Sequence, residues 1–402
     1  MSARLVIRFS LHANLGGLII LFTAFGGTLH SQTVLTGNQA AVEITNRTNL
    51  TRYKDNLKKL GSYGSRTFNS SGPTASNDSG VAYVKRELEK AGYNVTIFGT
   101  YRSIFCTKVG TVSPDSMYLV SGHVDGVGGA GGAIDDNASG TGLVLEAARA
   151  FADTNIKTRC TIRFFVWNAH EIGWKGSDEY VKARRSLQGK EDPLGSKQYP
   201  EPVWKALINS DMLLWDHGLP SGPTQISGAD IDLHYDTNCF PDNSIAICQQ
   251  LAAVDNVVSI SYPSQINTHL FGSDAVVFVN LKACPAVDLR EDDRIDEIGK
   301  GSNPNHHTST DVYSTYSDAD FALGYSAVRR VTGALSILTN ATVKIAGTDV
   351  KHSDHSIAPA SQKSELRTYD ASGRAANQPA RSLRSHAAKR FFSRLSHGSA
   401  SD

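Results

Sequence analysis

Residues 117–125, Met-Tyr-Leu-Val-Ser-Gly-His-Val-Asp, decide the fold more than any other stretch of this 402-residue chain. The first five residues form an apolar run that is typical of strands buried on both faces of a parallel sheet. His123 follows where this strand should end, and Asp125 lies two positions later, on the same side of an extended chain. The stretch therefore predicts a buried strand that delivers polar side chains to one edge of a sheet.

Strand and helix patterns alternate on both sides of this stretch. We expect further strands at 93–98, 161–167, 206–210 and 283–289, and helical segments at 38–60, 80–91, 140–151, 177–183 and 321–338. Loops are expected at 61–79 and 126–132, which are rich in Gly, Ser or Asn, and Ser177 is a suitable N-cap. Strands alternating with helices predict an α/β fold in which a mixed, mostly parallel central sheet has helices on both faces.

The two ends of the chain differ from its middle. Arg4 and Arg8 precede an apolar segment, 15–25, that is shorter than the roughly 20 residues needed to span a bilayer. We therefore interpret 1–31 as a signal peptide, with a membrane anchor as the alternative, and expect a secreted or extracytoplasmic protein, periplasmic in a Gram-negative bacterium. Residues 351–402 carry nine Lys and Arg against four Asp and Glu and few large apolar residues, which predicts a disordered basic tail over 349–402. One folded domain is left at 32–348.

Charge and cysteine content exclude some classes of function. The formal net charge is +1, so no general attraction to nucleic acid or to an anionic membrane is expected, and the partner must be set by a local site. Five cysteines leave at least one thiol unpaired within the chain. Cys239 and Cys248, which are close in sequence, are either a disulfide or buried apolar thiols, because their spacing is not that of a structural zinc site.

Acidic and imidazole side chains follow one predicted strand after another. Residues 132–140 contain Asp135 and Asp136 between small residues, residues 164–171 end in His170 and Glu171, and residues 208–212 deliver Asp211. Open α/β folds place their sites at the carboxyl ends of such strands. The pattern predicts a metal site built from residues distant in sequence: His123, Asp136, Glu171 and Asp211, with His307 from far downstream. Asp125 could accept the second ring N–H of His123 and fix its tautomer.

These residues resemble metallopeptidase family 28, the co-catalytic zinc aminopeptidases, which also contains carboxypeptidases and glutaminyl cyclases. The matching segments occur in family order between about residues 40 and 345: 121–125 (Ser-Gly-His-Val-Asp), 135–140 (Asp-Asp-Asn-Ala-Ser-Gly), 170–177 (His-Glu-Ile-Gly-Trp-Lys-Gly-Ser), 209–212 (Asn-Ser-Asp-Met), 272–274 (Gly-Ser-Asp) and 307–311 (His-Thr-Ser-Thr-Asp). The resemblance implies a zinc-exopeptidase-like fold for 32–348, two Zn²⁺ ions, and a peptide or protein substrate with a free N-terminus.

The resemblance also implies a role for each residue of the site. Asp136 would bridge the two ions. Glu171 and His307 would complete the coordination of one ion, and His123 and Asp211 would complete that of the other. Asp125 would orient His123, and Asp135 is a candidate for the acidic lining that holds the substrate amine. Glutaminyl cyclases of the family use one zinc and only the equivalents of Asp136, Glu171 and His307, so the presence of His123 and Asp211 argues against that reaction.

Two positions depart from the family pattern. His170 stands where relatives have the Glu that acts as general base, and an imidazole could take over that role. The alternative is a catalytically weakened or non-catalytic member that binds metal and a peptide or protein partner. His306 stands where some relatives place a Tyr that steadies the oxyanion; it could donate a similar hydrogen bond, or it could be an incidental surface histidine.

Overall fold

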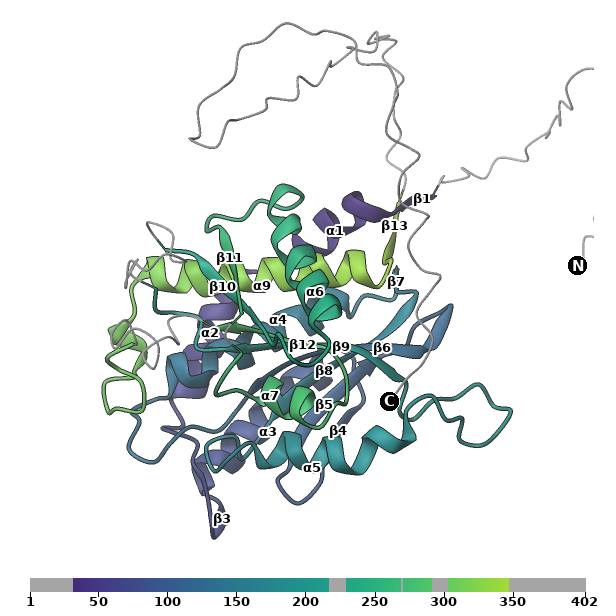
Figure 1. Cartoon of the computed structure of the whole chain (residues 1–402). Coiled ribbons are helices and arrows are strands. Elements are labelled where there is room, and N and C mark those ends of the chain that lie inside the picture. Colours follow the sequence, from purple (N-terminus) through teal and green to yellow (C-terminus); the bar gives the residue numbers. More distant parts are fainter. Residues whose placement is uncertain (1–31, 217–228, 269, 291–302, 347–402) are drawn as a thin grey trace, which may run out of the picture. The chain divides into compact units, whose positions relative to one another are not determined.

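The computed structural model describes residues 32–216, 229–268, 270–290 and 303–346 (Figure 1). The expectations for a signal peptide at 1–31 and a disordered tail at 349–402 lie outside the described residues. Within them, no helix combines the length and the apolar character needed to cross a membrane.

The central sheet has eight strands and is mixed. Its strands are β4 (Val95–Phe98), β5 (Ser103–Lys108), β6 (Ser113–His123), β8 (Cys160–Trp167), β9 (Val203–Asp211), β10 (Ile231–Tyr235), β11 (Ser264–Asn267) and β12 (Ala286–Arg290), in the order β11-β10-β12-β9-β6-β8-β5-β4. The middle pairs β12·β9, β9·β6 and β6·β8 are parallel, whereas β5 and β4 join antiparallel at one edge and β10 is antiparallel to β12. The predicted α/β fold with a mixed sheet is confirmed.

Helices cover both faces of this sheet (Figure 1). One core contains residues of α1 (Gly37–Thr45), α2 (Leu50–Gly61), α3 (Ala75–Lys90), α4 (Gly140–Phe151), α6 (Pro241–Ala253) and α9 (Asp318–Leu338). The second core contains residues of α5 (Lys175–Arg184) and α7 (Asp274–Asn280). Successive strand residues enter opposite cores: in β8, Phe164 packs in the first and Phe165 in the second. Burial on both faces is why these strands read as continuous apolar runs.

Smaller elements complete the described chain. The strands β1 (Gln32–Leu35), β13 (Thr342–Ala346) and β7 (Ile156–Lys157) form a three-stranded sheet, and β2 (Phe68–Asn69) pairs with β3 (Gly72–Pro73). Short 3₁₀ helices occur at η2 (Arg185–Leu187), η3 (Val254–Asn256) and η4 (Tyr313–Thr315), and η1 (Ile134–Ser139) is a kinked segment in which Asp136 and Asn137 have non-helical backbone angles. Of these, η1 belongs to the functional site.

The structure corrects several predicted boundaries. The helical segment 38–60 is two helices, because Asn49 caps α2 by accepting a hydrogen bond from the backbone of Arg52. The loop predicted at 61–79 ends early, because Thr74 caps α3 in the same way. Ser177 is not an N-cap: it lies inside α5, which begins after Trp174, and its hydroxyl donates to Trp174 and Asp274.

The disulfide considered for Cys239 and Cys248 is wrong, because both residues are free thiols. Cys248 lies inside α6 and faces the core, 3.9 Å from the carbonyl oxygen of Leu233, and burial raises the pKa of its thiol to about 12. Cys239 lies in the loop before α6, where its backbone N–H donates to Asp236. The two cysteines are close in sequence but do not form a disulfide. The alternative prediction, a buried apolar thiol, fits Cys248.

Candidate metal centre

The site lies where the carboxyl ends of three neighbouring parallel strands meet. His123 is the last residue of β6 and Asp211 the last of β9, while His170 and Glu171 follow the end of β8. Because these strands are adjacent and parallel, their polar extensions converge at one edge of the sheet. Two further segments complete the site: Asp136 comes from η1, directly before α4, and His307 from the loop before α9.

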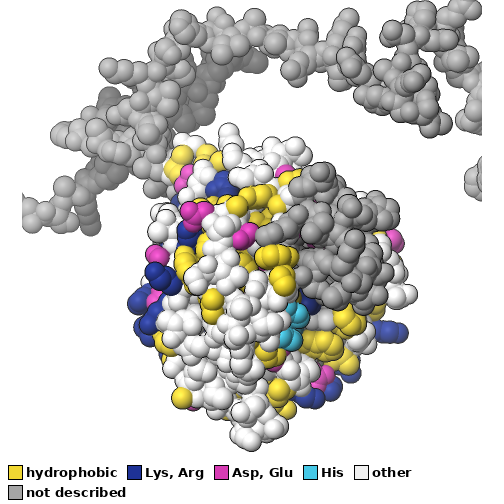
Figure 2. Space-filling model, turned by 90° about the vertical axis from the view of Figure 1, so that its left-hand side faces the viewer, with side chains coloured by type: hydrophobic (Ala, Val, Ile, Leu, Met, Phe, Trp, Pro, Cys, Tyr) yellow, Lys and Arg dark blue, Asp and Glu magenta, His cyan; other side chains and the backbone are white. Residues whose placement is uncertain are grey.

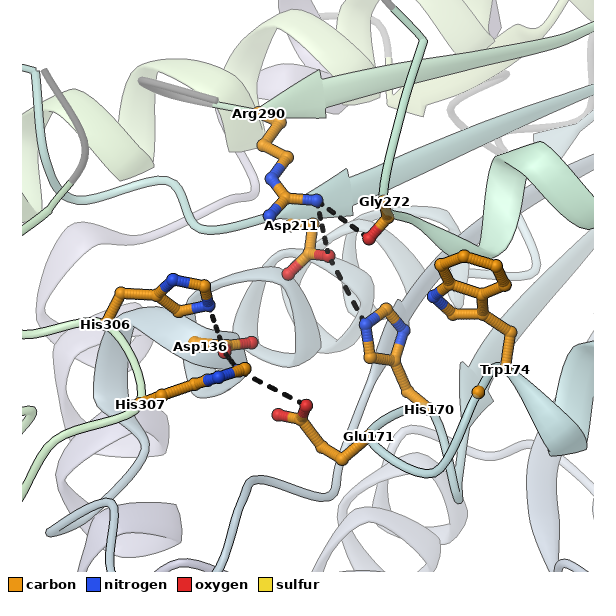
Figure 3. A pocket seen from close by; sticks show the side chains of 10 residues that line it. Asp136, His170, Glu171, Trp174, Asp211, Gly272, Arg290, His306 and His307 are labelled. Carbon is orange, nitrogen blue, oxygen red and sulfur yellow. Dashed lines mark hydrogen bonds and ion pairs between the residues drawn. The ribbon is translucent and has the colours of Figure 1, made fainter. Parts of the chain in front are cut away.

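All five predicted ligand residues come together around Asp136. Its Oδ2 lies 2.9 Å from Nε2 of His307, which is itself 3.3 Å from Oε2 of Glu171. Its Oδ1 lies 3.3 Å from Nε2 of His123, which is 3.3 Å from Oδ1 of Asp211. Asp136 therefore turns one oxygen toward each of two groups, and Figure 3 shows it between His307 and Asp211.

The donor set suits zinc. Ligand atoms of His123, Asp136 and Glu171 lie within 4.8 Å of one another, and those of Asp136, His306 and His307 form a second such group. Oε1 of Glu171 is buried and has no hydrogen-bond partner within the described residues, a state that is costly unless another group, such as a cation, satisfies the oxygen. Imidazole nitrogens mixed with carboxylate oxygens are the ligands that catalytic zinc takes. The residues present fit the metal that the resemblance implies.

The acidic and imidazole groups of the cluster shift one another's pKa values. Burial alone would raise the pKa of Asp136, but hydrogen bonds with His123, His306 and His307 hold it well below its usual range. Hydrogen bonds to Asp136 and Glu171 raise the pKa of His307 to about 10. Burial and the nearby Asp136 raise the pKa of Glu171.

These shifts predict how zinc binding depends on pH. In the metal-free protein, the raised pKa of His307 contributes stability that is fully present below pH 6.5 and is lost as the pH rises through about 10. Zinc binds only the unprotonated imidazole and must displace this proton. We expect zinc affinity to rise with pH over the same interval, with proton release on binding near pH 7. Calorimetry in buffers of different ionisation enthalpy measures that release, and a heat of binding independent of the buffer would contradict the expectation.

Asp125 supports the site in two ways. Nδ1 of His123 lies 2.9 Å from the backbone oxygen of Asp125 and 3.7 Å from its carboxylate, so the closer contact that fixes the ring is the backbone carbonyl. The carboxylate instead accepts the backbone N–H groups of His170 and Glu171, each at 3.1 Å. The buried Asp125 therefore ties the end of β6 to the segment that follows β8.

Asp135 does not line the site, which corrects its predicted role in holding a substrate amine. Its carboxylate is buried, and its two oxygens accept hydrogen bonds from the backbone of Leu214 and the side chain of Asn303. The neighbouring peptide is held from the other side, since the carboxylate of Asp311 accepts the backbone N–H groups of Asp135 and Asp136. Asp135 and Asp311 together fix the backbone that presents Asp136.

A buried arginine, Arg66, stabilises the backbone around the site through hydrogen bonds. Arg66 donates hydrogen bonds to the backbone oxygens of Val124, Gly132 and Ala133, so it links the segment after β6 to the glycine-rich loop before η1. Burial lowers the pKa of Arg66 to about 10, partly offset by the nearby carboxylates, so it stays charged at neutral pH.

His170 and His306, the two departures from the family pattern, both reach the site. Nδ1 of His170 lies 2.8 Å from Asp274, and its Nε2 lies 4.0 Å from Asp211. Burial lowers the pKa of His170, but Asp274 and Asp211 raise it to about 9. Nε2 of His306 lies 3.1 Å from Asp136, and its side chain is 31 % exposed. His306 is thus part of the site and not an incidental surface histidine.

A cavity of about 260 Å³ opens over these side chains. Its lining consists of Asp136, His170, Glu171, Gly173, Trp174, Asp211, Gly272, Arg290, His306 and His307. Figure 3 shows the imidazole, carboxylate and guanidinium groups of the lining turned toward one another. Histidine side chains reach the surface on the face drawn in Figure 2, in keeping with the partial exposure of His306 and His307.

Substitution of Gly140 tests how closely the turn that carries Asp136 is packed. A Cβ at this position would collide with the backbone oxygen of Ser210, next to Asp211, and with the side chain of Asn137. We expect Gly140→Ala to reduce the free energy of unfolding by about 1–3 kcal/mol, as overpacking does. Urea denaturation measures the loss. Gly128→Ala is the control, because its Cβ would meet only Thr67 at 4.0 Å; equal stability of the two variants would contradict the close packing of this turn.

Three residues of the site were not assigned a role from the sequence: Asp274, Arg290 and Arg66. Asp274 lies in the segment 272–274 that matches the family pattern, so its position was visible although its contact with His170 was not. Arg290 ends β12, donates to Gly272 and lies 3.8 Å from Asp211. Arg66 had no signal, because it lies in a segment expected to be a loop.

Curated proteins match parts of this chain. Leupeptin-inactivating enzyme 1 of Streptomyces exfoliatus is 34 % identical over 124 residues, 29 % of this chain and 27 % of that protein. The probable leucine aminopeptidase 2 of Aspergillus fumigatus is 34 % identical over 89 residues (22 % and 17 %), and carboxypeptidase Q of Bos taurus is 32 % identical over 77 residues (19 % and 16 %). The matches thus span about a quarter or less of these relatives' lengths.

Solved structures resemble this one over most of their length. The LapA aminopeptidase of Legionella pneumophila has a TM-score of 0.57 at 16 % identity, covering 79 % of this chain and 78 % of that chain. An aminopeptidase from Aneurinibacillus sp. strain AM-1 has a TM-score of 0.53 at 12 % identity, covering 74 % and 96 %. At these identities the likeness shows a shared fold. Residues 106–328, more than half of the chain, match the sequence profile of Peptidase family M28, and the chain therefore belongs to that family.

Proposed function

We propose that this protein is a zinc-dependent aminopeptidase with two metal sites that share Asp136. The observation that carries the proposal is the placement of Asp136, one oxygen facing His307 and the other facing His123. Glu171 would complete the first site and Asp211 the second. When bound, zinc supplies Lewis-acid chemistry, polarising a carbonyl group and lowering the pKa of water.

The chain's own residues would orient the substrate and handle its protons. His306 lines the cavity and is partly exposed, so its ring can donate a hydrogen bond to the oxygen of a carbonyl under attack. His170 directs Nε2 toward the carboxylates, and this atom can either accept a proton or bind a metal ion. The cavity of about 260 Å³ is at or below the lower end of small-molecule sites, which favours the end of a peptide over the middle of a long chain.

The preference for a free N-terminus is supported by the family and by relatives that are named aminopeptidases. Carboxypeptidase Q among the relatives marks the main alternative. A location outside the cytoplasm is part of the proposal and rests on the signal-like pattern of Arg4, Arg8 and the apolar segment 15–25.

Purified, zinc-loaded protein assayed on paired substrates tests the proposal. We expect hydrolysis of amino-acid amides with a free amine and no hydrolysis of the same amides with an acetylated amine. Removal of zinc with a chelator should stop the reaction, and added zinc should restore it. Hydrolysis of the acetylated substrate alone would overturn the aminopeptidase claim, and a zinc-loaded protein without hydrolysis would favour a non-catalytic binding role.

A further inference from the structure

His170 forms a third group of ligand-type side chains with His123 and Asp211. Ligand atoms of these three residues lie within 4.8 Å of one another, and all three are buried. The two imidazole rings are stacked, with centroids 3.7 Å apart and planes 7° from parallel. Nε2 of His123 lies 3.3 Å from Oδ1 of Asp211, and Nε2 of His170 lies 4.0 Å from Oδ2 of the same carboxylate. One carboxylate is thus approached by two parallel imidazoles.

The tautomer of His170 is set by a buried acceptor. Nδ1 lies 2.8 Å from Oδ2 of Asp274, and the other oxygen of Asp274 accepts a hydrogen bond of 2.5 Å from Ser177. Asp274 is fully buried, so its carboxylate is held in place. Nδ1 of His170 donates to this carboxylate, and Nε2 is left as the ring atom that can bind a cation. A carboxylate behind a histidine is the usual support of a metal-binding imidazole.

His123 is prepared in the same manner. Its Nδ1 donates to the backbone oxygen of Asp125 at 2.9 Å, which leaves Nε2 for the site. Two cationic rings 3.7 Å apart would repel each other, whereas two neutral imidazoles can direct both Nε2 atoms to one shared metal ion. Joint ligation of one metal ion would hold both stacked rings in the neutral form.

The position of His170 distinguishes between two possible roles for this residue, metal ligand and general base. A general base would have to reach a water held at the first metal site, among Asp136, Glu171 and His307. The ligand atoms of Asp136 cluster with those of Glu171 and His123, or of His306 and His307, whereas His170 clusters with His123 and Asp211. His170 is therefore placed at the second metal site.

We propose that His170 is a ligand of the second zinc ion, which would then be held by His123, His170, Asp211 and the shared Asp136. This inference rests on the proposed function, because it assumes the second ion. Four protein ligands are typical of closed zinc sites, whereas catalytic sites keep a position open. The second ion would then be the tightly held one, and the first, held by Asp136, Glu171 and His307, would keep a position open for substrate.

The test compares zinc binding in the wild type and in His170→Gln, a substitution that removes the imidazole and keeps a similar volume. Competition titration with a chromophoric chelator measures both dissociation constants, and X-ray absorption measures imidazoles per zinc. We expect the second zinc to bind more than about 100-fold more weakly, a loss larger than that of removing a supporting residue, and the protein to lose one zinc-bound imidazole. Asp318→Asn at the start of α9, where the carboxylate is 92 % exposed and pairs with Lys54, should leave both constants unchanged.

Asp274→Asn gives a second variant that retains His170 but replaces the carboxylate behind it. We expect the second zinc to bind about 10–100-fold more weakly in this variant. This measurement still tests the inference if His170→Gln does not fold. Unchanged zinc affinity and unchanged imidazole count in His170→Gln, with a lower kcat, would overturn the inference and make His170 a base. A wild type that binds two zinc ions and hydrolyses nothing would instead contradict the proposed function and leave the ligation intact.

Discussion

Asp136→Asn should abolish both zinc binding and hydrolysis. Asp136 contacts His123, His306 and His307, and it is the residue that the two metal groups share. An amide has the shape of the carboxylate but lacks its charge, so each group loses its central anion. Because a catalytic metal supplies several kcal/mol of transition-state stabilisation, kcat/KM should fall by at least about 10³-fold.

Elemental analysis and steady-state kinetics measure these losses together. The matched control is Asp318→Asn at the start of α9, where the carboxylate is 92 % exposed and pairs with Lys54 at the surface. The control should retain two zinc ions and full activity. An Asp136→Asn variant that keeps both zinc ions would show that Asp136 is not the shared ligand.

Replacement of the neighbouring residues His306 and His307 by Gln should have sharply different effects on zinc affinity and on kcat. The ring nitrogen of His307 pairs with both Asp136 and Glu171, as a ligand of the first ion should, whereas the carboxylate paired with His306 is Asp136. We expect His307→Gln to weaken the first zinc by more than about 100-fold. His306→Gln should keep zinc affinity within about tenfold but lower kcat by about 10²–10³-fold, as removal of an oxyanion donor does.

The adjacent positions make each variant the control of the other. Zinc affinity and kcat are measured on the same preparations, so a folding defect would appear in both values. Equal loss of zinc in the two variants would place His306 among the ligands and contradict its role toward the substrate.

The sequence predicted the central fold because burial on two faces leaves an unambiguous pattern. The continuous apolar runs that precede His123 and Asp211 became β6 and β9, and their shared edge followed from parallel pairing. Several other elements escaped prediction. The strands β5 and β10 and the helix α7 contain polar residues or are short, so periodicity does not distinguish them from loops.

The candidate site was predicted as a set of residues but not as a network. Convergence of His123 and Asp211 followed from strand ends, whereas the contacts of Asp135 and Asp274 depend on how loops pack. Asp135 stands next to Asp136 in sequence, yet the chain turns it inward to Asn303. Such differences between neighbouring residues are set by tertiary packing, which the pattern of residues along the sequence does not reveal.

Diffraction from crystals of the zinc-loaded protein, measured at the zinc absorption edge, locates the bound ions. We expect two anomalous peaks, one among Asp136, Glu171 and His307 and the other among Asp136, His123 and Asp211. A single peak, or zinc bound away from Asp136, would contradict this expectation.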